Sequence, residues 1–471
     1  MSVTKLLVLI LSFCALSGCA TRGALNIDCE NFKSFVEDVK PSQLVRDIQS
    51  DTQHGIVIMS VDTASNPEIV SSPLVKTFEN LSLTNAHLLA LRPTGTPARQ
   101  KGVLLLSGGG QWGAFGAGFL NELQTSTRPH PVDFQVVTGV STGGLQSLFI
   151  AIDTVDPAAY KKLLVSYSPL NEKAVVNRNA KPLAILTGSL AGLKPLRRKI
   201  EEALCTRGNA SNGCPMIDAL ARSGRIVYIG FVQASDGKFK YADAVRIAQS
   251  GSGAASVKQR KNAQQCLTGI ALASAAMPVF FQQVRINQQA YYDGGVRQSV
   301  FEQNIAESLA VAEKLAQARV AQSGIRGASW IVTAPDLYVI RNGPTELLGE
   351  EGKPEADFKV DGSAGALTAA FRAEAIVVNQ LEVGSIAALR LAHPTGKIHL
   401  VTADGYHKPF LLAGSPQDAC RKPKDIMFDR AFMLCLQKLG ASKAQRDEPW
   451  KELATLGTAN PPVAATASSG P

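Results

Sequence analysis

The feature that most constrains the fold is a pair of short apolar segments, each leading into a glycine-rich turn. Residues 103–106 (VLLL) precede the glycine run 108–110, and residues 134–137 (FQVV) precede the turn at 139–143. A short apolar run without alternation is typical of a strand buried on both faces, as in a parallel sheet covered by helices. Because a helical pattern follows each turn, the sequence predicts an α/β fold.

Further patterns extend this alternation of helices and strands along the chain. They predict helices at 113–123, 145–152, 193–204, 216–221, 263–276, 305–321, 367–391 and 427–439, and strands at 225–232, 238–241, 284–292, 329–340 and 397–401. From these patterns we divide the chain into a signal peptide (1–18), an N-terminal extension with a strand at 55–59 (19–100), a main domain (101–410, core motifs at 102–300), a C-terminal helical segment (411–453) and a disordered tail (454–471).

The overall charge is basic but dispersed. Lys and Arg number 48 against 39 Asp and Glu, and 45% of the residues are hydrophobic. That composition is typical of a folded protein, and the positive charges form only short clusters. A nucleic-acid interface would need a denser basic patch, so we expect no nucleic-acid partner and a mild attraction to anionic membrane surfaces.

The first residues have the organisation of a bacterial export signal. Lys5 precedes an apolar run at 6–16, and Leu16-Ser17-Gly18-Cys19 looks like a lipobox, in which the Cys19 thiol is acylated before cleavage. Acyl chains bind a bilayer with about 0.8 kcal/mol per buried methylene. We therefore predict a lipoprotein of the bacterial cell envelope, anchored to a membrane. Ala20 after Cys19 favours the periplasmic side of the outer membrane, and the inner membrane is the alternative. The alternative is cleavage nearby, for example after Ala20, which would give a soluble periplasmic or secreted protein.

The remaining cysteines suggest disulfides in an oxidising compartment. Apart from Cys14 in the leader and Cys19, the sequence has Cys29, Cys205, Cys214, Cys266, Cys420 and Cys435. The sequence spacing favours pairing of Cys205 with Cys214 and of Cys420 with Cys435, and free buried thiols are the alternative. No Cys-x-x-Cys or Cys/His cluster suggests a metal site.

Ser141 lies in the turn Gly139-Val140-Ser141-Thr142-Gly143, which matches G-x-S-x-G. In a nucleophile elbow, a strand, a sharp turn and a helix expose a serine at the sheet edge, and small flanking residues are needed for the strained turn. Strand, turn and helix are all predicted here in that order. The sequence thus indicates Ser141 as a candidate nucleophile with Gly139 and Gly143 as elbow glycines, although a structural glycine turn can have the same pattern.

The glycines Gly108, Gly109 and Gly110 are candidates for an oxyanion hole. Consecutive glycines let several backbone N–H groups point at one spot, and acyl transfer needs such preorganised donors. The same letters satisfy the dinucleotide fingerprint G-x-G-x-x-G, which requires an acidic residue at the end of the next strand. Asp133 lies at the beginning of that strand, so we favour the oxyanion loop.

Asp293 is the candidate base for Ser141. It follows a predicted strand in Tyr291-Tyr292-Asp293-Gly294-Gly295, where a tight turn can direct its carboxylate into a cleft. An Asp-Gly turn that only stabilises itself is the commoner role of this dipeptide.

Taken together, these motifs resemble the patatin-like phospholipase family. The glycine loop 108–114, the G-x-S-x-G turn, the segment 273–278 (ASAAMP) and Asp293-Gly294-Gly295 follow one another in the family's order, over roughly residues 102–300. The resemblance implies a three-layer α/β/α fold with a mostly parallel central sheet. It also implies a Ser141–Asp293 dyad without histidine, an oxyanion loop at 108–110, lipid or phospholipid ester substrates and no metal or organic cofactor.

Two positions depart from the family pattern. Many relatives have Arg or Lys in the glycine loop where this chain has Trp112, and Gly144 follows the elbow where Ala is common. Backbone donors do not depend on either side chain, so we expect activity to be retained, with a possible change in headgroup preference.

Two alternatives to a dyad hydrolase remain. His393, His399 and His407 follow Asp293 in the chain order of a Ser-His-Asp α/β-hydrolase. A non-catalytic envelope scaffold that kept the fold without turnover is the second alternative.

Overall fold

The computed structural model describes residues 24–39, 70, 72–90, 101–125, 132–179, 188–301, 303–322, 332, 334–347, 366–423 and 426–456. The leader, Cys19, the strand predicted at 55–59 and nearly all of the predicted tail lie outside these residues. One large sheet runs, in spatial order, through β1 (Leu25–Ile27), β10 (Val284–Ile286), β11 (Gln289–Asp293), β7 (Ile226–Gln233), β4 (Asp133–Val140), β3 (Lys101–Leu106), β12 (Leu337–Arg341), β13 (Ile398–Thr402) and β16 (Lys451–Glu452).

The centre of this sheet is parallel. Strands β7, β4, β3, β12 and β13 all run in one direction, while β11, β10 and β16 supply the antiparallel pairings. A branch adds β8 (Phe239–Asp243), which pairs with β7 and with β2 (Val36–Asp38). From β3 the chain moves to one side through β4 and later to the other side through β12. Open α/β folds bind their ligands at the carboxyl ends of the strands, at the point where the strand order reverses in this way.

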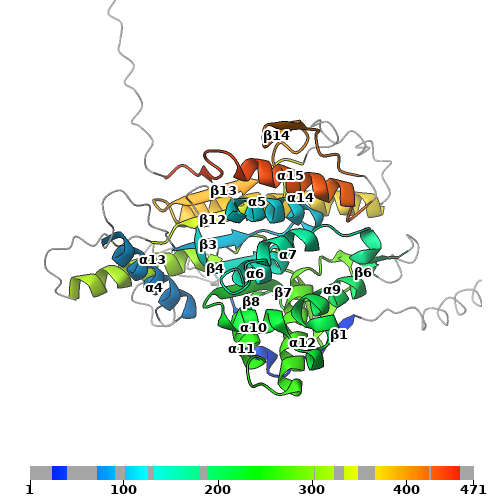
Figure 1. The fold of residues 1–471 in the computed structure, drawn as a ribbon, viewed down its shortest axis with the longest axis horizontal. Helices are drawn as coiled ribbons and strands as arrows, with labels where there is room; N and C mark the ends of the chain where they lie inside the picture. The colour runs from blue at the N-terminus through cyan, green and yellow to red at the C-terminus, as the bar shows by residue number, and fades with distance from the viewer. Residues whose placement is uncertain are drawn as a thin grey trace, which may run out of the picture.

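Helices cover both faces of the sheet (Figure 1). One face carries α5 (Gly113–Thr125), α6 (Thr142–Ala151), α7 (Ala159–Ser166), α9 (Lys194–Leu204), α10 (Pro215–Arg222), α11 (Ala244–Ser250), α12 (Val257–Ser274) and α15 (Arg430–Ala444), and the other carries α4 (Pro73–Ala90), α13 (Gln303–Gln322) and α14 (Ala366–Ala392). Successive residues of β3 belong to hydrophobic cores on opposite faces of the sheet. Leu104 shares one core with Phe115 of α5, and Leu105 shares the other with Phe78 of α4 and Leu389 of α14. The three-layer α/β/α fold is therefore confirmed.

The segments before and after the predicted main domain pack against it. Strand β1 extends the large sheet beside β10, and Cys29 just after it forms a disulfide with Cys266 of α12. At the other end of the chain, α15 lies against α5 (Figure 1), where a Cβ on Gly118 would come within 2.1 Å of the Gln437 carbonyl oxygen. This close approach fixes a glycine at position 118.

Three disulfides form among the described residues. Cys205 pairs with Cys214 and Cys420 with Cys435, so both predicted pairings are confirmed. The Cys29–Cys266 bond, which spans 237 residues, was not predicted.

Several element boundaries differ from the predicted ones. The helix expected from 263 begins at Val257, because Ser256 and Gln259 form a capping box ahead of a polar first turn. The helix expected from 427 begins at Arg430, where Asp429 caps it. The strand expected within 329–340 is present as Leu337–Arg341, and residues 329–331 and 333 lie outside the described ranges. Helices α4, α7 and α11 were not predicted, nor were the small sheets of β5 (Asn177–Arg178), β6 (Ser189–Gly192) and β9 (Val279–Phe281), and of β14 (Phe410–Leu412) and β15 (Ser415–Gln417).

Among the described helices, a stretch of α14 from Arg372 to Ala392 is long and apolar enough to cross a membrane by length and composition. In the fold it packs on the sheet through Ile386 and Leu389 and carries the buried Glu382. It therefore serves as a covering helix of the sheet.

Candidate active site

Ser141 occupies a strained turn between β4 and α6. Its backbone has φ 55° and ψ −124°, a left-handed conformation that costs a residue with a side chain about 1–3 kcal/mol. Small neighbours make the turn possible: a Cβ on Gly139 would lie 2.2 Å from the Gly143 oxygen, and one on Gly143 would lie 2.4 Å from the Leu106 oxygen. The turn holds the serine at the carboxyl edge of the parallel strands.

The backbone of Ser141 is held by the buried end of α12. Its amide donates to Ser274 Oγ at 2.8 Å, and that hydroxyl donates in turn to the Gly230 carbonyl at 2.6 Å. Ser274 is fully buried and so cannot exchange this bond for water. The sequence analysis named the segment 273–278 but did not identify a role for Ser274.

Asp293 comes to Ser141 from the antiparallel side of the sheet. In the strand register it lies opposite Phe231, one residue from Gly230, which lies opposite Val140. Its carboxyl accepts the Gly295 amide at 2.7 Å and interacts with the Ser141 side chain, which lowers its pKa. The structure thus brings the predicted nucleophile and base together.

Burial sets the protonation behaviour of Asp293. The residue is 1% exposed, and loss of hydration raises the pKa of its carboxyl from 3.8 to about 7. The hydrogen bonds from Ser141 and Gly295 oppose this rise, and the nearby Glu382 adds to it. A carboxyl with a pKa near neutrality is suited to general-base catalysis at physiological pH.

The glycine loop passes directly beside Ser141. A Cβ on Gly108 would lie 3.3 Å from the Ser141 Cβ, and Gly109 and Gly110 both have positive φ, 138° and 56°. A Cβ on Gly109 would lie only 1.9 Å from the Asn342 carbonyl oxygen. The loop therefore needs glycine at position 109 in order to lie where it does.

The three loop amides differ in what they bind. The Gly108 amide donates to Ser299 Oγ at 3.3 Å, so it is already used within the protein. Among the described residues we find no acceptor for the amides of Gly109 and Gly110. Among the described residues, the Gly109 and Gly110 amides are thus the loop donors available to an oxyanion, and the place of Gly108 in the oxyanion loop stays a prediction.

Buried amides fix the loop from behind. Asn342 follows β12 and donates through its side chain to the Ser107 carbonyl and to Gln146 Oε1, both at 3.0 Å. Gln146 of α6 donates onward to the Gly113 carbonyl at 2.6 Å. These contacts connect the loop to both the elbow helix and β12, and sequence patterns gave no sign of Asn342 or Gln146.

Helix α14 contributes two carboxylates that the sequence analysis missed. Glu382 is buried, accepts from Ser299 Oγ at 2.7 Å and pairs with Arg341 at 3.0 Å. Glu374, two turns earlier, has a pKa raised to about 8, chiefly by burial and further by the charge of Asp293. Two carboxyl groups of α14 thus lie near the candidate base, and the Glu382 carboxylate raises the pKa of Asp293.

None of the three candidate histidines is bonded to the candidate nucleophile or base. His393 precedes β13, and His399 is the second residue of that strand and hydrogen bonds with Asp336 at 3.3 Å, so both belong to the opposite edge of the sheet. His407 follows β13 and packs edge-on against the ring of Tyr406. None of the three forms a hydrogen bond with Ser141 or Asp293.

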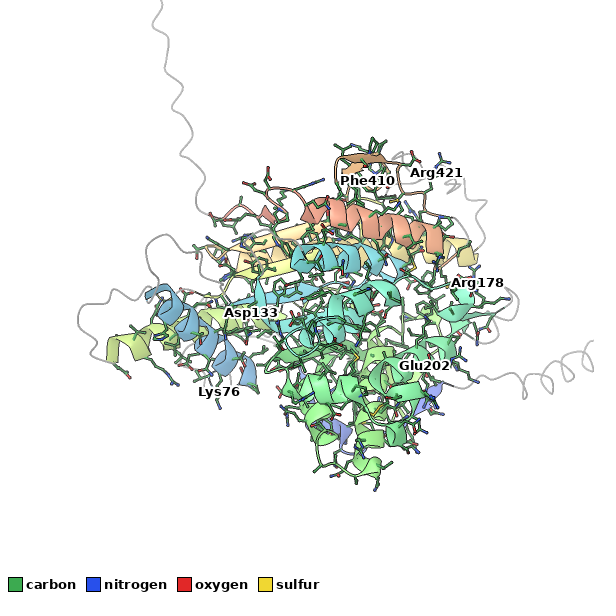
Figure 2. All side chains as sticks on the ribbon, viewed as in Figure 1. Lys76, Asp133, Arg178, Glu202, Phe410 and Arg421 are labelled. Carbon is green, nitrogen blue, oxygen red and sulfur yellow. A yellow bond between two sulfur atoms is a disulfide. The ribbon has the colours of Figure 1, made fainter. Side chains whose placement is uncertain are left out.

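Asp133 and Trp112, which the sequence analysis also discussed, make contacts within the fold. Asp133, labelled in Figure 2, begins β4 and pairs at 3.2 Å with the buried Arg225, which also binds Asp153. It therefore lies at the edge of the sheet opposite the glycine loop. Trp112 packs edge-on against the rings of Tyr406 and Phe432.

This arrangement can support acyl transfer. It combines a hydroxyl at the carboxyl edge of the sheet, a buried carboxyl that interacts with it and two backbone N–H donors beside it. These are the groups that nucleophilic cleavage of an ester needs. Within the described ranges, no group of three or more His, Cys, Asp or Glu residues could hold a metal ion.

Comparison with known families supports the same conclusion. The model of the patatin-like phospholipase family matches residues 104–303, which include the glycine loop, the elbow and Asp293. Among curated proteins, none matches the chain closely enough to count as a relative.

Proposed function

We propose that this chain, which contains a patatin-like phospholipase domain over residues 104–303, is a lipid acyl hydrolase working through a Ser141–Asp293 dyad. The observation that carries the proposal is that the strand register brings the buried Asp293 beside the elbow of Ser141, where the two side chains interact, while none of the three candidate histidines is hydrogen-bonded to either residue. Its substrates are carboxylic esters of phospholipids or related lipids.

In the proposed reaction Asp293 moves one proton at each half of the cycle. Ser141 Oγ attacks the ester carbonyl carbon while its proton passes to the Asp293 carboxylate, and the amides of Gly109 and Gly110 bind the oxyanion. Collapse of the tetrahedral intermediate breaks the ester C–O bond, and the leaving alcohol takes the proton from Asp293. Water then attacks the acyl carbon of acyl-Ser141 and gives a proton to Asp293. Collapse of this second intermediate breaks the bond between the acyl carbon and Ser141 Oγ, Asp293 returns the proton to Oγ, and the fatty acid leaves.

Covalent labelling tests the nucleophile. Wild-type protein should react with a fluorophosphonate probe and hydrolyse a soluble ester, and Ser141→Ala should do neither. A folded wild type that is not labelled would refute the proposal and favour the non-catalytic scaffold.

A second set of variants tests the base. His393→Ala, His399→Ala and His407→Ala should each retain hydrolysis, whereas Asp293→Asn should lose it. A single inactive histidine variant with an intact fold would replace the dyad by a triad.

The membrane anchor is a separate part of the proposal. We propose that Cys19 carries acyl chains that hold the enzyme on an envelope membrane, which would place it beside its lipid substrates. Metabolic palmitate labelling should disappear in Cys19→Ala, and unchanged labelling would refute the anchor without affecting the hydrolase.

A further inference from the structure

A chain of buried contacts joins the glycine loop to α14. The Gly108 amide donates to Ser299 Oγ at 3.3 Å, and Ser299 Oγ donates to Glu382 Oε1 at 2.7 Å. The second carboxylate oxygen of Glu382 pairs with Arg341 at 3.0 Å. Ser299, Glu382 and Arg341 are at most 4% exposed, so water cannot replace any of these contacts.

Arg341 is itself fixed on its far side. Its guanidinium donates to Asn379 Oδ1 at 2.6 Å and to the Pro344 carbonyl. Glu382 is thereby held by a cation that has little freedom to move. Placing two charges in a protein interior carries a large desolvation cost, and apolar residues of similar size often stabilise a fold as well or better. The location of this pair beside the loop therefore points to a role other than stability.

We propose that Glu382 is a positioning residue, which acts through Ser299 to fix the glycine loop so that the Gly109 and Gly110 amides face the oxyanion. This inference rests on the proposed hydrolase function. Because the Gly108 amide donates to Ser299 Oγ, only the Gly109 and Gly110 amides of the loop can face the substrate. The donors are then preorganised before the substrate binds, and such donors contribute most to catalysis.

Glu382 also affects the pKa of Asp293 through its charge. The charged and titratable groups facing Asp293 are Ser141 at the elbow and Glu374 and Glu382 on α14, with Arg341 behind Glu382. The charge of Glu382 raises the pKa of Asp293. Glu382→Gln should therefore shift the acidic limb of the pH–rate profile to lower pH, whereas Ser299→Ala, which keeps the charge, should leave that limb in place.

The experiment compares kcat, KM and pH profiles of Ser299→Ala and Glu382→Gln with those of wild type on a soluble ester. Loss of an oxyanion donor lowers kcat about 100- to 1,000-fold, so a mispositioned loop should lower kcat of Ser299→Ala at least about 10-fold with KM nearly unchanged. Glu202→Gln is the matched control, because Glu202 is an exposed residue of α9 far from these contacts (Figure 2), and it should behave as wild type.

The outcomes separate this inference from the proposed function. A folded Ser299→Ala with wild-type kcat would overturn the positioning role while the hydrolase proposal stands. A Glu382→Gln whose acidic limb does not move would overturn the electrostatic influence of Glu382 on Asp293. If wild type itself neither hydrolyses esters nor reacts with fluorophosphonate, the proposed function has failed instead. Should Glu382→Gln not fold, Ser299→Ala decides the question alone.

Discussion

Replacing Asp293 with asparagine should abolish ester hydrolysis and at the same time stabilise the fold, by an amount that grows with pH. The exchange keeps the shape of the side chain. Asparagine can still accept the Gly295 amide through Oδ1 and can donate to Ser141 Oγ through its amide nitrogen. The variant therefore removes a buried charge and a base while leaving no cavity.

The magnitude follows from the difference in pKa between the folded and unfolded chains. Burial raises the pKa of Asp293 from 3.8 to about 7, so the unfolded chain releases this proton more readily. Stability contributed by the neutral carboxyl is complete below pH 3.8 and is lost as pH rises to about 7. At 1.36 kcal/mol for each pH unit, the cost to wild type is about 2 kcal/mol at pH 5 and about 4 kcal/mol at pH 9.

Chemical denaturation at both pH values provides the measurement. The stability advantage of Asp293→Asn over wild type should increase by about 2–3 kcal/mol between pH 5 and pH 9. Asp28→Asn, an exchange at an exposed position, controls for general charge effects and should show no such trend. A difference that is constant with pH, or an Asp293→Asn protein less stable than wild type at pH 9, would refute the burial argument.

Three further outcomes follow from the same geometry. Initial rates of wild type should rise as pH increases through about 7, because Asp293 acts as a base only when ionised, and a profile already flat from pH 5 would contradict this. Gly109→Ala should lower kcat by about 100-fold or more, since its Cβ would lie 1.9 Å from the Asn342 oxygen and displace the loop; a kinetic comparison with wild type tests it. Ser274→Ala should destabilise the fold by about 1–3 kcal/mol in a denaturant titration, because the Ser141 amide loses its buried acceptor, and an unchanged midpoint would show that the contact is dispensable.

The central fold could be predicted because its signals are local. Continuous apolar runs at 103–106 and 134–137 indicate strands covered on both faces, and the glycine turns after them mark the carboxyl edge. The strands β1 and β2 could not be found in this way. They are three residues long, and what fixes them is pairing with β10 and β8, which lie more than 200 residues away in the sequence.

In the candidate site, too, residues with a local sequence signature could be predicted and residues without one could not. Ser141 and Asp293 lie in turns whose residue types are constrained by backbone geometry, so motifs expose them. Glu382, Ser299 and Asn342 have no local signature, because a glutamate in an apolar helix and polar residues in loops occur in many folds. Their role depends on contacts between α14, η7 (Gly294–Val296), β12 and the glycine loop, which only the tertiary structure reveals.

The disulfide between Cys29 and Cys266 has a consequence for biogenesis. Its partners are 237 residues apart, so the Cys29 thiol cannot reach its native partner until more than half of the protein has been made. In that interval Cys205 and Cys214, which are only 9 residues apart, are available as competing partners. Correct maturation should therefore be faster with a disulfide-exchange catalyst, because uncatalysed reshuffling takes minutes to hours. Since Cys266 and Ser274 share α12, a mispaired chain would also lose the support that holds Ser141.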